Sequence, residues 1–472
     1  MTAAESHSEI RELIRKSLRR LADARRTDQG WQDKGKSGPG LLKTLEALEA
    51  ILTPVNVLSD LTLAPDAVQQ LIEDDLRALV TEIEKDRWVP EPYLYSTLKE
   101  KCADARVPFE KQDSWCIDAA SFAVTTFLDA LEYFEKIRVG AGPSRGKDVK
   151  PENGTDLRER MIGTITIGVT WLTEQAISAD NQTQWTWGSR MAGRPSLYFT
   201  YSAAAALSAY IQDSDPKQKK RIIPANAALR ERAEKCLLGA YTWTVQSTRP
   251  LDEKNQDIVG IMDPALRGTE EPYEEQAFLV WGLGILEAYC TATGVHPEVE
   301  ILLPIAKTMV NLHKSNEYRE LFTQSYYHVI ELRGLTEKYE DRTIIFLAAR
   351  GVSWVISELR QVPDKIPSAL LVSLEEMIVS LYREIINDQD AGTKLWSAGR
   401  FEIYRTQRSL EALSYLVKYF GEDKLPKPQS ERDAMTRALT DVFSNEEVLS
   451  YLVEKLLNRM RLIDRSDQRP QV

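Results

Sequence analysis

Hydrophobic residues recur along this chain with helical spacing, and polar residues fill the positions between them. One short phrase repeats within this pattern: Leu, then an acidic or small polar residue, Ala, and Leu or Tyr. Its copies begin at Leu45, Leu128, Leu207, Leu286 and Leu410, which are 83, 79, 79 and 124 residues apart. Self-similarity at a nearly constant period indicates a repeat architecture, and the widest interval leaves room for a sixth copy beginning near Ile344.

The helical segments are of two alternating kinds. Amphipathic segments with charged outer faces are expected at 8–25, 65–85, 156–175, 227–245, 298–314 and 366–388. More apolar segments, rich in small residues, follow them at 41–53, 118–137, 198–211, 274–290, 341–358 and 402–419. No run alternates apolar and polar residues for more than a few positions, so no sheet is expected.

Six outer–inner pairs predict an all-α fold: a closed (α/α)6 double ring of about twelve helices with C-terminal capping helices. Open solenoids use about 34 to 47 residues per helix pair, whereas these pairs mostly take about 60 to 80. We expect the toroid to span residues 1–420, and 421–472 to form a helical cap and a disordered tail. The long loops that precede the inner helices are expected to carry function.

A second echo aligns two of the outer helices. The tetrapeptide Leu-Arg-Glu-Arg begins at Leu157 and again at Leu229, and in each case a tryptophan, Trp171 or Trp243, follows 14 residues after the leucine. Equal spacing predicts that both tryptophans occupy equivalent positions, between an outer helix and its inner partner.

Composition narrows the class of protein further. The 472 residues are 43% hydrophobic and 28% charged, with a net charge of −11, which disfavours nucleic acid as a partner because non-specific affinity for it comes from clustered Lys and Arg. No apolar run reaches 18 residues, so no transmembrane segment is expected. The polar N-terminus lacks a signal-peptide core, and four scattered cysteines suit a reducing compartment, so we expect a cytoplasmic protein.

Turns with Gly and Trp precede two of the small-residue helices. Asp28-Gln-Gly-Trp31 leads to Gly38-Pro-Gly and then Thr44-Leu-Glu-Ala-Leu, and Trp185-Thr-Trp187 leads to Pro195-Ser-Leu-Tyr198 and Tyr201-Ser-Ala-Ala. This order resembles the (α/α)6 toroids of terpenoid cyclases and protein prenyltransferase β-subunits. The resemblance covers about residues 8–420 and implies a central funnel inside the ring.

The motifs that carry the chemistry of those families are absent. The DxDD acid of the cyclases does not occur, and Glu73-Asp74-Asp75 lies on a predicted outer helix. The zinc of the prenyltransferases needs Asp, Cys and His ligands, and none of the four histidines (His7, His296, His313 and His328) is spaced with a Cys or Asp in that pattern. We therefore expect no metal site and no cofactor.

Aromatic and ionisable residues cluster where loops lead into the inner helices. A concave site lined by aromatic residues with a few convergent polar groups is typical of ligand binding. The alternative is that the aromatics hold the loops and the carboxylates cap helices. The candidate ligand-binding residues are Trp115, Asp118, Trp185, Trp187, Tyr198, Tyr201, Asp263, Tyr273, Glu274, Asp341, Arg342, Trp396, Arg400, Tyr404 and Arg405.

Without a recognisable catalytic motif, the favoured function is a helical toroid that binds a small-molecule ligand or a protein partner at the funnel mouth, possibly within a larger assembly. The alternative is an enzyme acting in the central funnel, either terpenoid-cyclase-like or carbohydrate-active. A carbohydrate-active hydrolase or lyase would need two facing carboxylates in an open cleft, and a filled funnel would favour a scaffold. A cyclase would need a mostly aromatic cavity with one isolated acid.

Overall fold

The computed structural model describes part of the chain. The described residues are 12–21, 41–58, 65–88, 99–100, 103–104, 106, 115–140, 154–178, 184–187, 195–215, 222–224, 226–252, 255–261, 279–315, 326–332, 335–341, 344–389, 395–396 and 402–424. Ser8–Tyr419 form one compact unit, and Met1–His7 with Phe420–Val472 form a second. The account below concerns the first unit. The predicted division at residue 420 stays a prediction, because 425–472 lie outside the described residues.

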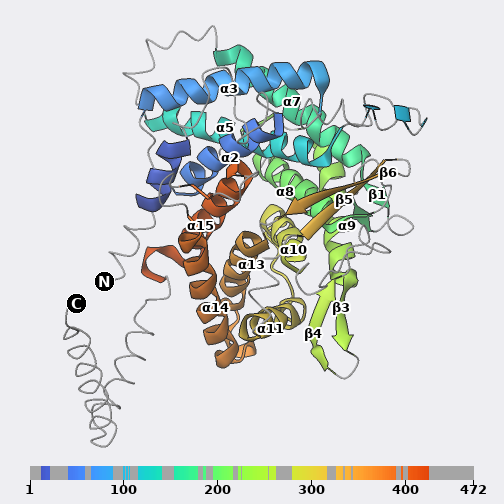
Figure 1. The fold of residues 1–472 in the computed structure, drawn as a ribbon, viewed down its shortest axis with the longest axis vertical. Helices are drawn as coiled ribbons and strands as arrows, with labels where there is room; N and C mark the ends of the chain where they lie inside the picture. The colour runs from blue at the N-terminus through green and yellow to red at the C-terminus, as the bar shows by residue number, and fades with distance from the viewer. Residues whose placement is uncertain are drawn as a thin grey trace, which may run out of the picture. The chain divides into compact units, whose positions relative to one another are not determined.

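The helices alternate between an outer and an inner ring (Figure 1). The outer helices are residues 12–21, α3 (Pro65–Asp86), α7 (Gly154–Glu174), α9 (Ala227–Ser247), α11 (Val299–Lys314) and α14 (Ser368–Asn387). The inner helices are α2 (Leu41–Val57), α5 (Ile117–Gly140), α8 (Leu197–Asp213), α10 (Leu279–Thr293), α13 (Ile344–Leu359) and α15 (Glu402–Lys424). Each lies where the hydrophobic pattern predicts it, so the (α/α)6 fold class is confirmed.

Hydrogen bonds and ion pairs link neighbouring inner helices at several points around the ring. The Ser208 hydroxyl on α8 donates to the Ala288 carbonyl on α10 at 2.7 Å. The first and last inner helices meet through the Gln407 amide, which donates to Glu49 on α2 at 3.2 Å. In the outer ring, Gln389 just after α14 donates to Ser17 at 2.9 Å. These contacts between opposite ends of the sequence close both rings.

Small residues allow the inner helices to approach closely. Gly284 on α10 faces the ring of Tyr201 on α8, and a Cβ placed on this glycine would lie 2.4 Å from two ring carbons. Any larger residue would therefore push α8 and α10 apart. The apolar character of α10 has the same origin, since eleven of its residues are buried on all sides of the helix.

Three antiparallel hairpins fill loops between outer and inner helices, where no strands were expected. They are β1 (Ile177–Ser178) with β2 (Trp185–Thr186), β3 (Thr248–Asp252) with β4 (Asn255–Ile261), and β5 (Tyr326–Leu332) with β6 (Leu335–Asp341). β1 and β2 have two residues each, and the seven-residue strands β4, β5 and β6 do not alternate strictly between apolar and polar residues, so the hydrophobic pattern does not predict them. Tertiary contact supplies the missing stabilisation: the backbone N–H of Val259 on β4 donates to the Thr308 hydroxyl on α11 at 2.8 Å.

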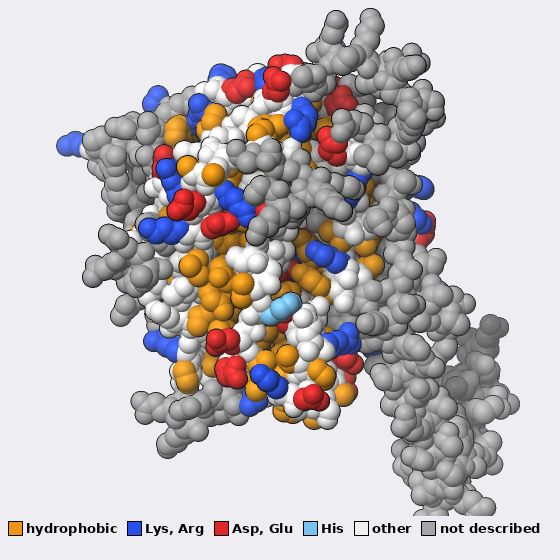
Figure 2. All heavy atoms as spheres, turned by 180° about the vertical axis from the view of Figure 1, so that it is seen from behind, with side chains coloured by type: hydrophobic (Ala, Val, Ile, Leu, Met, Phe, Trp, Pro, Cys, Tyr) orange, Lys and Arg blue, Asp and Glu red, His pale blue; other side chains and the backbone are white. Residues whose placement is uncertain are grey.

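Within the described ranges, no helix is both long and apolar enough to cross a membrane. On the face shown in Figure 2, basic and acidic side chains are interspersed with apolar ones, and no extended patch of one charge is visible among the described residues.

The two aligned tryptophans provide a test of the repeat alignment. Trp171 and Trp243 are both buried, on α7 and α9. Trp171→Ala and Trp243→Ala should each lower the free energy of unfolding by about 3–5 kcal/mol, because each removes a large buried aromatic. Urea denaturation would measure the effect.

The same two helices offer matched controls that face solvent, Ile167 on α7 and Leu238 on α9, which are 41% and 47% exposed. Their alanine variants should change stability by no more than ~0.5 kcal/mol. A tryptophan variant that unfolds at the same urea concentration as its control would contradict the alignment.

Candidate active site

The inner helices surround a central cavity of about 360 Å³. All six contribute to its wall, which carries six carboxylates, three basic side chains and four aromatic rings. These are Glu49, Asp129, Glu132, Asp213, Glu287, Glu411, Arg350, Arg408, Lys418, Phe122, Tyr201, Tyr415 and Tyr419. A cavity of this size and polarity suits a small polar ligand.

The repeated phrase places its second residue in this cavity. In the structure the equivalent segment of α2 is Leu48-Glu49-Ala50, three residues later than the copy recognised at Leu45, and that of α13 is Ala349-Arg350-Gly351. With this alignment the second residues are Glu49, Asp129, Ser208, Glu287, Arg350 and Glu411, and all six line the cavity. Equivalent positions of the six repeats therefore converge on the axis of the ring, and we call these residues the polar ring.

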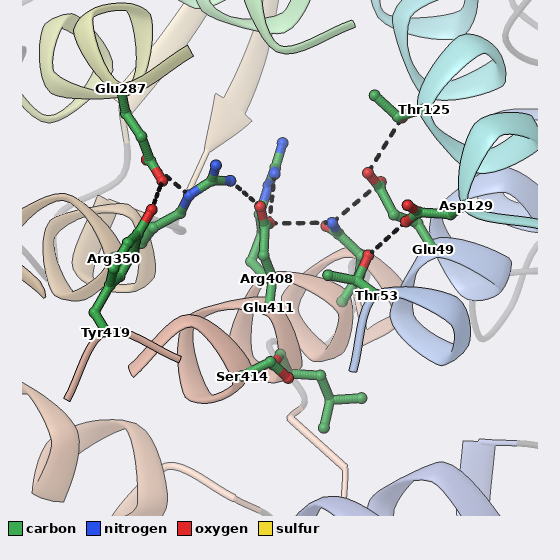
Figure 3. Close-up of polar contacts among 12 residues, drawn as sticks. Glu49, Thr53, Thr125, Asp129, Glu287, Arg350, Arg408, Glu411, Ser414 and Tyr419 are labelled. Atoms are coloured by element: carbon green, nitrogen blue, oxygen red, sulfur yellow. Dashed lines mark hydrogen bonds and ion pairs between the residues drawn. The ribbon is translucent and has the colours of Figure 1, made fainter. Parts of the chain in front are cut away.

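A chain of ion pairs joins three of the inner helices across the cavity (Figure 3). The Arg350 guanidinium on α13 lies 3.1 Å from Glu287 on α10 and also pairs with Glu411 on α15. Glu411 accepts a second hydrogen bond, at 2.8 Å, from Arg408 on its own helix. The Tyr419 hydroxyl donates to Glu287 at 2.5 Å. Buried charges must be paired in this way, because removing them from water is costly.

One buried amide connects the two carboxylates that face each other from α2 and α15. The Gln407 amide nitrogen donates to Glu49 at 3.2 Å and to Glu411 at 3.3 Å. Glu49 accepts a further hydrogen bond from the Thr125 hydroxyl on α5 at 3.2 Å. Because a single nitrogen atom contacts both groups, the two carboxylates are close neighbours in the cavity, as two-carboxylate hydrolysis requires.

The environments of these two carboxylates shift their pKa values in opposite directions. Burial, reinforced by the neighbouring negative charge of Glu411, raises the pKa of Glu49 well above its usual value. Burial acts on Glu411 in the same sense, but Arg350 and Arg408 outweigh it and lower the pKa of Glu411. At a pH between the two pKa values, Glu49 therefore carries a proton while Glu411 is ionised. Such divergence within one site is typical of an acid and its partner base or nucleophile.

Two aspartates farther along the cavity also favour the protonated form. Burial and the nearby Glu132 raise the pKa of Asp129 to about 7, although the Thr53 hydroxyl donates to it at 3.1 Å. Burial, Glu132 and Asp129 together raise the pKa of Asp213 to about 7. This half of the cavity becomes more negative as the pH rises through neutrality.

Aromatic rings surround the basic groups of the site. The Arg408 guanidinium lies 5.3, 5.7 and 5.1 Å from the ring centroids of Phe122, Tyr201 and Tyr404. Tyr415 and Tyr419 stack with their centroids 5.8 Å apart, and Arg350 lies 4.2 Å from the Tyr415 centroid. These contacts hold the guanidinium groups in place and leave the tyrosine pair on the cavity wall.

Fifteen residues were predicted to bind a ligand. Among those that the structure describes, it places one on the cavity wall, Tyr201. The side chains of Trp185, Asp263, Tyr273, Glu274, Asp341, Arg342 and Arg400 lie outside the described residues.

Two predicted aromatic platforms hold loops instead of lining the cavity. The buried indole of Trp187 donates to the Leu172 carbonyl at 2.7 Å, at the end of α7, and its backbone N–H donates to the Thr200 hydroxyl. Trp396 makes the same two contacts: its indole donates to the Ile385 carbonyl at 2.5 Å, and its backbone N–H donates to the Thr406 hydroxyl. The pattern could not separate the two roles, because a ligand platform and a loop anchor both place Trp just before an inner helix.

The other predicted residues also pack against protein. Trp115 contacts the edge of Trp171, Tyr198 contacts Trp281, and Asp118 lies in the first turn of α5. Arg405 pairs with Asp388 at 2.6 Å. The Tyr404 ring packs against the Arg408 guanidinium, with its centroid 5.1 Å away.

The sequence contained a signal for the residues that were missed. A polar residue recurs at the second position of an otherwise buried phrase, and such a position is expected to face either a partner group or a cavity. The repeat indicates the architecture whichever way its second residue faces, so periodicity alone does not mark the Glu, Asp, Ser and Arg members as a site.

Comparison with known proteins supports the fold. No protein-family profile matches the chain, and no curated protein matches it in sequence. Among solved structures, the chain is similar to the α-1,6-mannanase GH76A of Salegentibacter sp. HEL1_6, an inactive variant with two aspartates changed to alanine, in complex with α-1,6-mannotetrose. The identity is 10%, the TM-score is 0.50, and the match covers 87% of this chain and 99% of that one.

At this identity the match shows the fold alone: it supports the helical toroid, and the resemblance to terpenoid cyclases is not shown. It also corrects the functional prediction. A toroid that only binds a ligand or protein partner was expected, whereas the structural neighbour is an enzyme with a bound oligosaccharide, which favours the carbohydrate-active alternative.

The ion pairs of the cavity predict a stability defect that depends on pH. Arg350→Met should lower the free energy of unfolding by about 3–5 kcal/mol at neutral pH, because it leaves Glu287 and Glu411 buried without their shared cation. The folded state lowers the pKa of Glu411, so its stabilising contribution is present above the unfolded pKa and is lost as the pH falls through the folded pKa. The difference from wild type should therefore shrink in acid.

Arg360→Met is the matched control for this experiment. Arg360 pairs with Glu375 at 2.6 Å, but both side chains are about one-third exposed. Its loss should cost no more than ~1 kcal/mol. If urea titrations at pH 7 gave equal losses in the free energy of unfolding for the two substitutions, the Arg350 ion pairs would stabilise the protein no more than an exposed ion pair does.

Proposed function

We propose that this chain is a carbohydrate-active enzyme that hydrolyses a glycosidic bond in the central cavity. The observation that carries the proposal is the Glu49–Gln407–Glu411 arrangement: two carboxylates joined through one amide, with pKa values shifted apart. Glycoside hydrolysis needs one protonated and one ionised carboxyl group flanking the scissile bond. The similarity of the fold to an α-1,6-mannanase supports the same class of reaction.

Glu49 is the proton donor in this proposal and Glu411 is the ionised partner. As the bond between the anomeric carbon and the leaving oxygen breaks, Glu49 transfers its proton to that oxygen. Glu411 stabilises the positive charge that develops on the sugar, by attack on the anomeric carbon or by taking a proton from the attacking water. The water oxygen ends on the anomeric carbon, and both carboxyl groups recover their starting states.

The remainder of the wall suits a sugar better than a terpenoid. Cyclisation of a hydrocarbon chain requires an apolar cavity with one isolated acid, whereas this wall carries six carboxylates and three basic groups. Such groups hydrogen-bond sugar hydroxyls. We therefore propose a neutral oligosaccharide as the ligand, with α-1,6-mannotetrose as the first substrate to test. We also propose that the protein is cytoplasmic, and cell fractionation would test this location.

Removing either carboxylate should abolish most of the activity. Glu49→Gln and Glu411→Gln should each lower kcat by about 10²- to 10⁴-fold, the usual contribution of a positioned acid or base. Glu159→Gln, which changes an exposed glutamate on α7, is the control and should retain wild-type kcat. Release of reducing ends from a panel of oligosaccharides measures the rate. Full activity in both cavity variants would remove these residues from the mechanism.

The pH profile gives an independent test of the roles. Activity requires ionised Glu411 and protonated Glu49, so it should fall in acid through the lowered pKa of Glu411 and in alkali through the raised pKa of Glu49. The negative charge of Asp129 helps to raise the pKa of Glu49. Asp129→Asn should therefore move the alkaline limb of kcat/KM to lower pH.

The control for this shift is Asp156→Asn, at an exposed position in the first turn of α7. It should leave both limbs where they are. An alkaline limb that stays in place in Asp129→Asn, or that moves equally in both variants, would contradict the assignment of Glu49 as the acid.

A further inference from the structure

The Thr125 hydroxyl lies between one carboxyl oxygen and two backbone carbonyls. Its oxygen is 3.2 Å from Glu49 Oε1 on α2 (Figure 3). It is also 3.2 Å from the Ser121 carbonyl and 3.1 Å from the Phe122 carbonyl of its own helix, α5. A hydroxyl has one hydrogen to donate and two lone pairs that accept. Thr125 can therefore serve Glu49 as a donor or as an acceptor, depending on where its single hydrogen points.

The other oxygen of Glu49 has a partner that donates. Glu49 Oε2 lies 3.2 Å from the Gln407 amide nitrogen, which also contacts Glu411 Oε2 at 3.3 Å. An amide NH2 group carries two hydrogens, one for each carboxyl group, and accepts none. Of the partners that the described part of the chain gives Glu49, the Thr125 oxygen is the one that can accept a proton. A protonated Glu49 therefore carries its proton on Oε1.

The two protonation states of Glu49 require opposite hydrogen bonds with Thr125, because two oxygens at this distance need one hydrogen between them. In the protonated state Glu49 supplies that hydrogen, and the Thr125 hydroxyl donates to the carbonyls of its own helix, as threonine in helices commonly does. In the ionised state Thr125 donates to Glu49. Rotation about the Cβ–Oγ1 bond of Thr125 exchanges the two arrangements and moves one hydrogen.

From this geometry we propose that Thr125 is a positioning residue for the acid: its hydroxyl accepts the proton that Glu49 carries on Oε1 and donates to that oxygen once the proton has left. This inference rests on the proposed function and adds a residue to it. During cleavage the leaving oxygen of the sugar replaces Thr125 as the acceptor of the proton, and the hydroxyl then turns to the new carboxylate. When Glu49 is protonated again the hydroxyl turns back, so Thr125 neither gains nor loses a proton over the cycle.

Thr125 opposes the groups that weaken Glu49 as an acid. Burial and the negative charges of Glu411 on α15 and Asp129 on α5 raise the pKa of Glu49. Arg408 on α15 and the Thr125 hydrogen bond lower this pKa. A hydrogen bond to a carboxylate is stronger than one to a neutral carboxyl group, so Thr125 stabilises the ionised form more than the acid. It therefore helps Glu49 to release its proton inside a buried site.

Removing the hydroxyl should change the rate and the pH profile together. Thr125→Val keeps the shape of the side chain and should lower kcat by about tenfold, the effect of one charge-assisted hydrogen bond that forms as the proton leaves. KM should not change, because the interaction is gained in the transition state. The alkaline limb of kcat/KM should move to higher pH, opposite to the shift expected for Asp129→Asn. Thr125→Ser retains a hydroxyl and should restore both the rate and the limb.

Thr244→Val is the matched control. The buried Thr244 hydroxyl on α9 donates to the Ala240 carbonyl at 2.9 Å, away from the cavity wall. This variant should keep the wild-type kcat and both pH limbs. If Thr125→Val behaved like this control, or if Thr125→Ser failed to restore the pH profile at a wild-type melting temperature, the assignment of Thr125 would be wrong.

A titration without substrate separates this inference from the proposed function. The carboxylic-acid C=O band that infrared spectra of wild type contain and spectra of Glu49→Gln lack belongs to Glu49. Its disappearance with rising pH should occur at higher pH in Thr125→Val than in wild type and Thr125→Ser. Equal titration in all three proteins, with oligosaccharide still cleaved, would overturn the role of Thr125 and leave the hydrolase assignment intact. A shifted band without cleavage of any oligosaccharide would overturn the hydrolase assignment, while the proton on Oε1 would stand.

Discussion

The buried ion pairs that connect Glu287, Arg350, Glu411 and Arg408 are the interaction on which the remainder of the site depends. They join α10, α13 and α15 across the axis of the ring, where six helices turn polar residues towards one another. Charges in such a place are tolerated only when each has a partner of opposite sign. Hydrophobic packing between neighbouring helices builds the toroid, but the balance of charge at its centre decides which residues can occupy that centre.

The same network sets the chemistry of the cavity. Two arginines keep Glu411 ionised, and the negative charge of Glu411 in turn helps to keep Glu49 protonated on the far side of Gln407. Structural pairing and functional tuning are therefore one arrangement, since removing Arg350 would alter both. The aromatic rings around Arg408 hold it in place, so a single side chain contributes to charge balance and to the pKa of Glu411.

Repeat geometry explains how one arrangement serves both charge balance and pKa tuning. Equivalent positions of the six inner helices meet at the axis, and they carry Glu, Asp, Ser, Glu, Arg and Glu instead of one residue repeated six times. The toroid supplies the position, and divergence among the repeats supplies the chemistry. This separation agrees with a fold that matches a mannanase at 10% identity.

The sequence by itself determined the six helix pairs and their order, because amphipathic spacing and the recurring phrase depend on local periodicity alone. It did not determine the site. Trp187 and Trp396, predicted to bind a ligand, are buried and hydrogen-bond backbone carbonyls of the outer helices. Glu49 and Glu411 are 362 residues apart, and only the closed ring brings both within reach of Gln407. Hairpins such as β3–β4 were also not predicted, because tertiary contacts with α11 help to hold them in place. Local pattern specifies a helix, whereas the partner of a buried charge is chosen by the tertiary contacts around it.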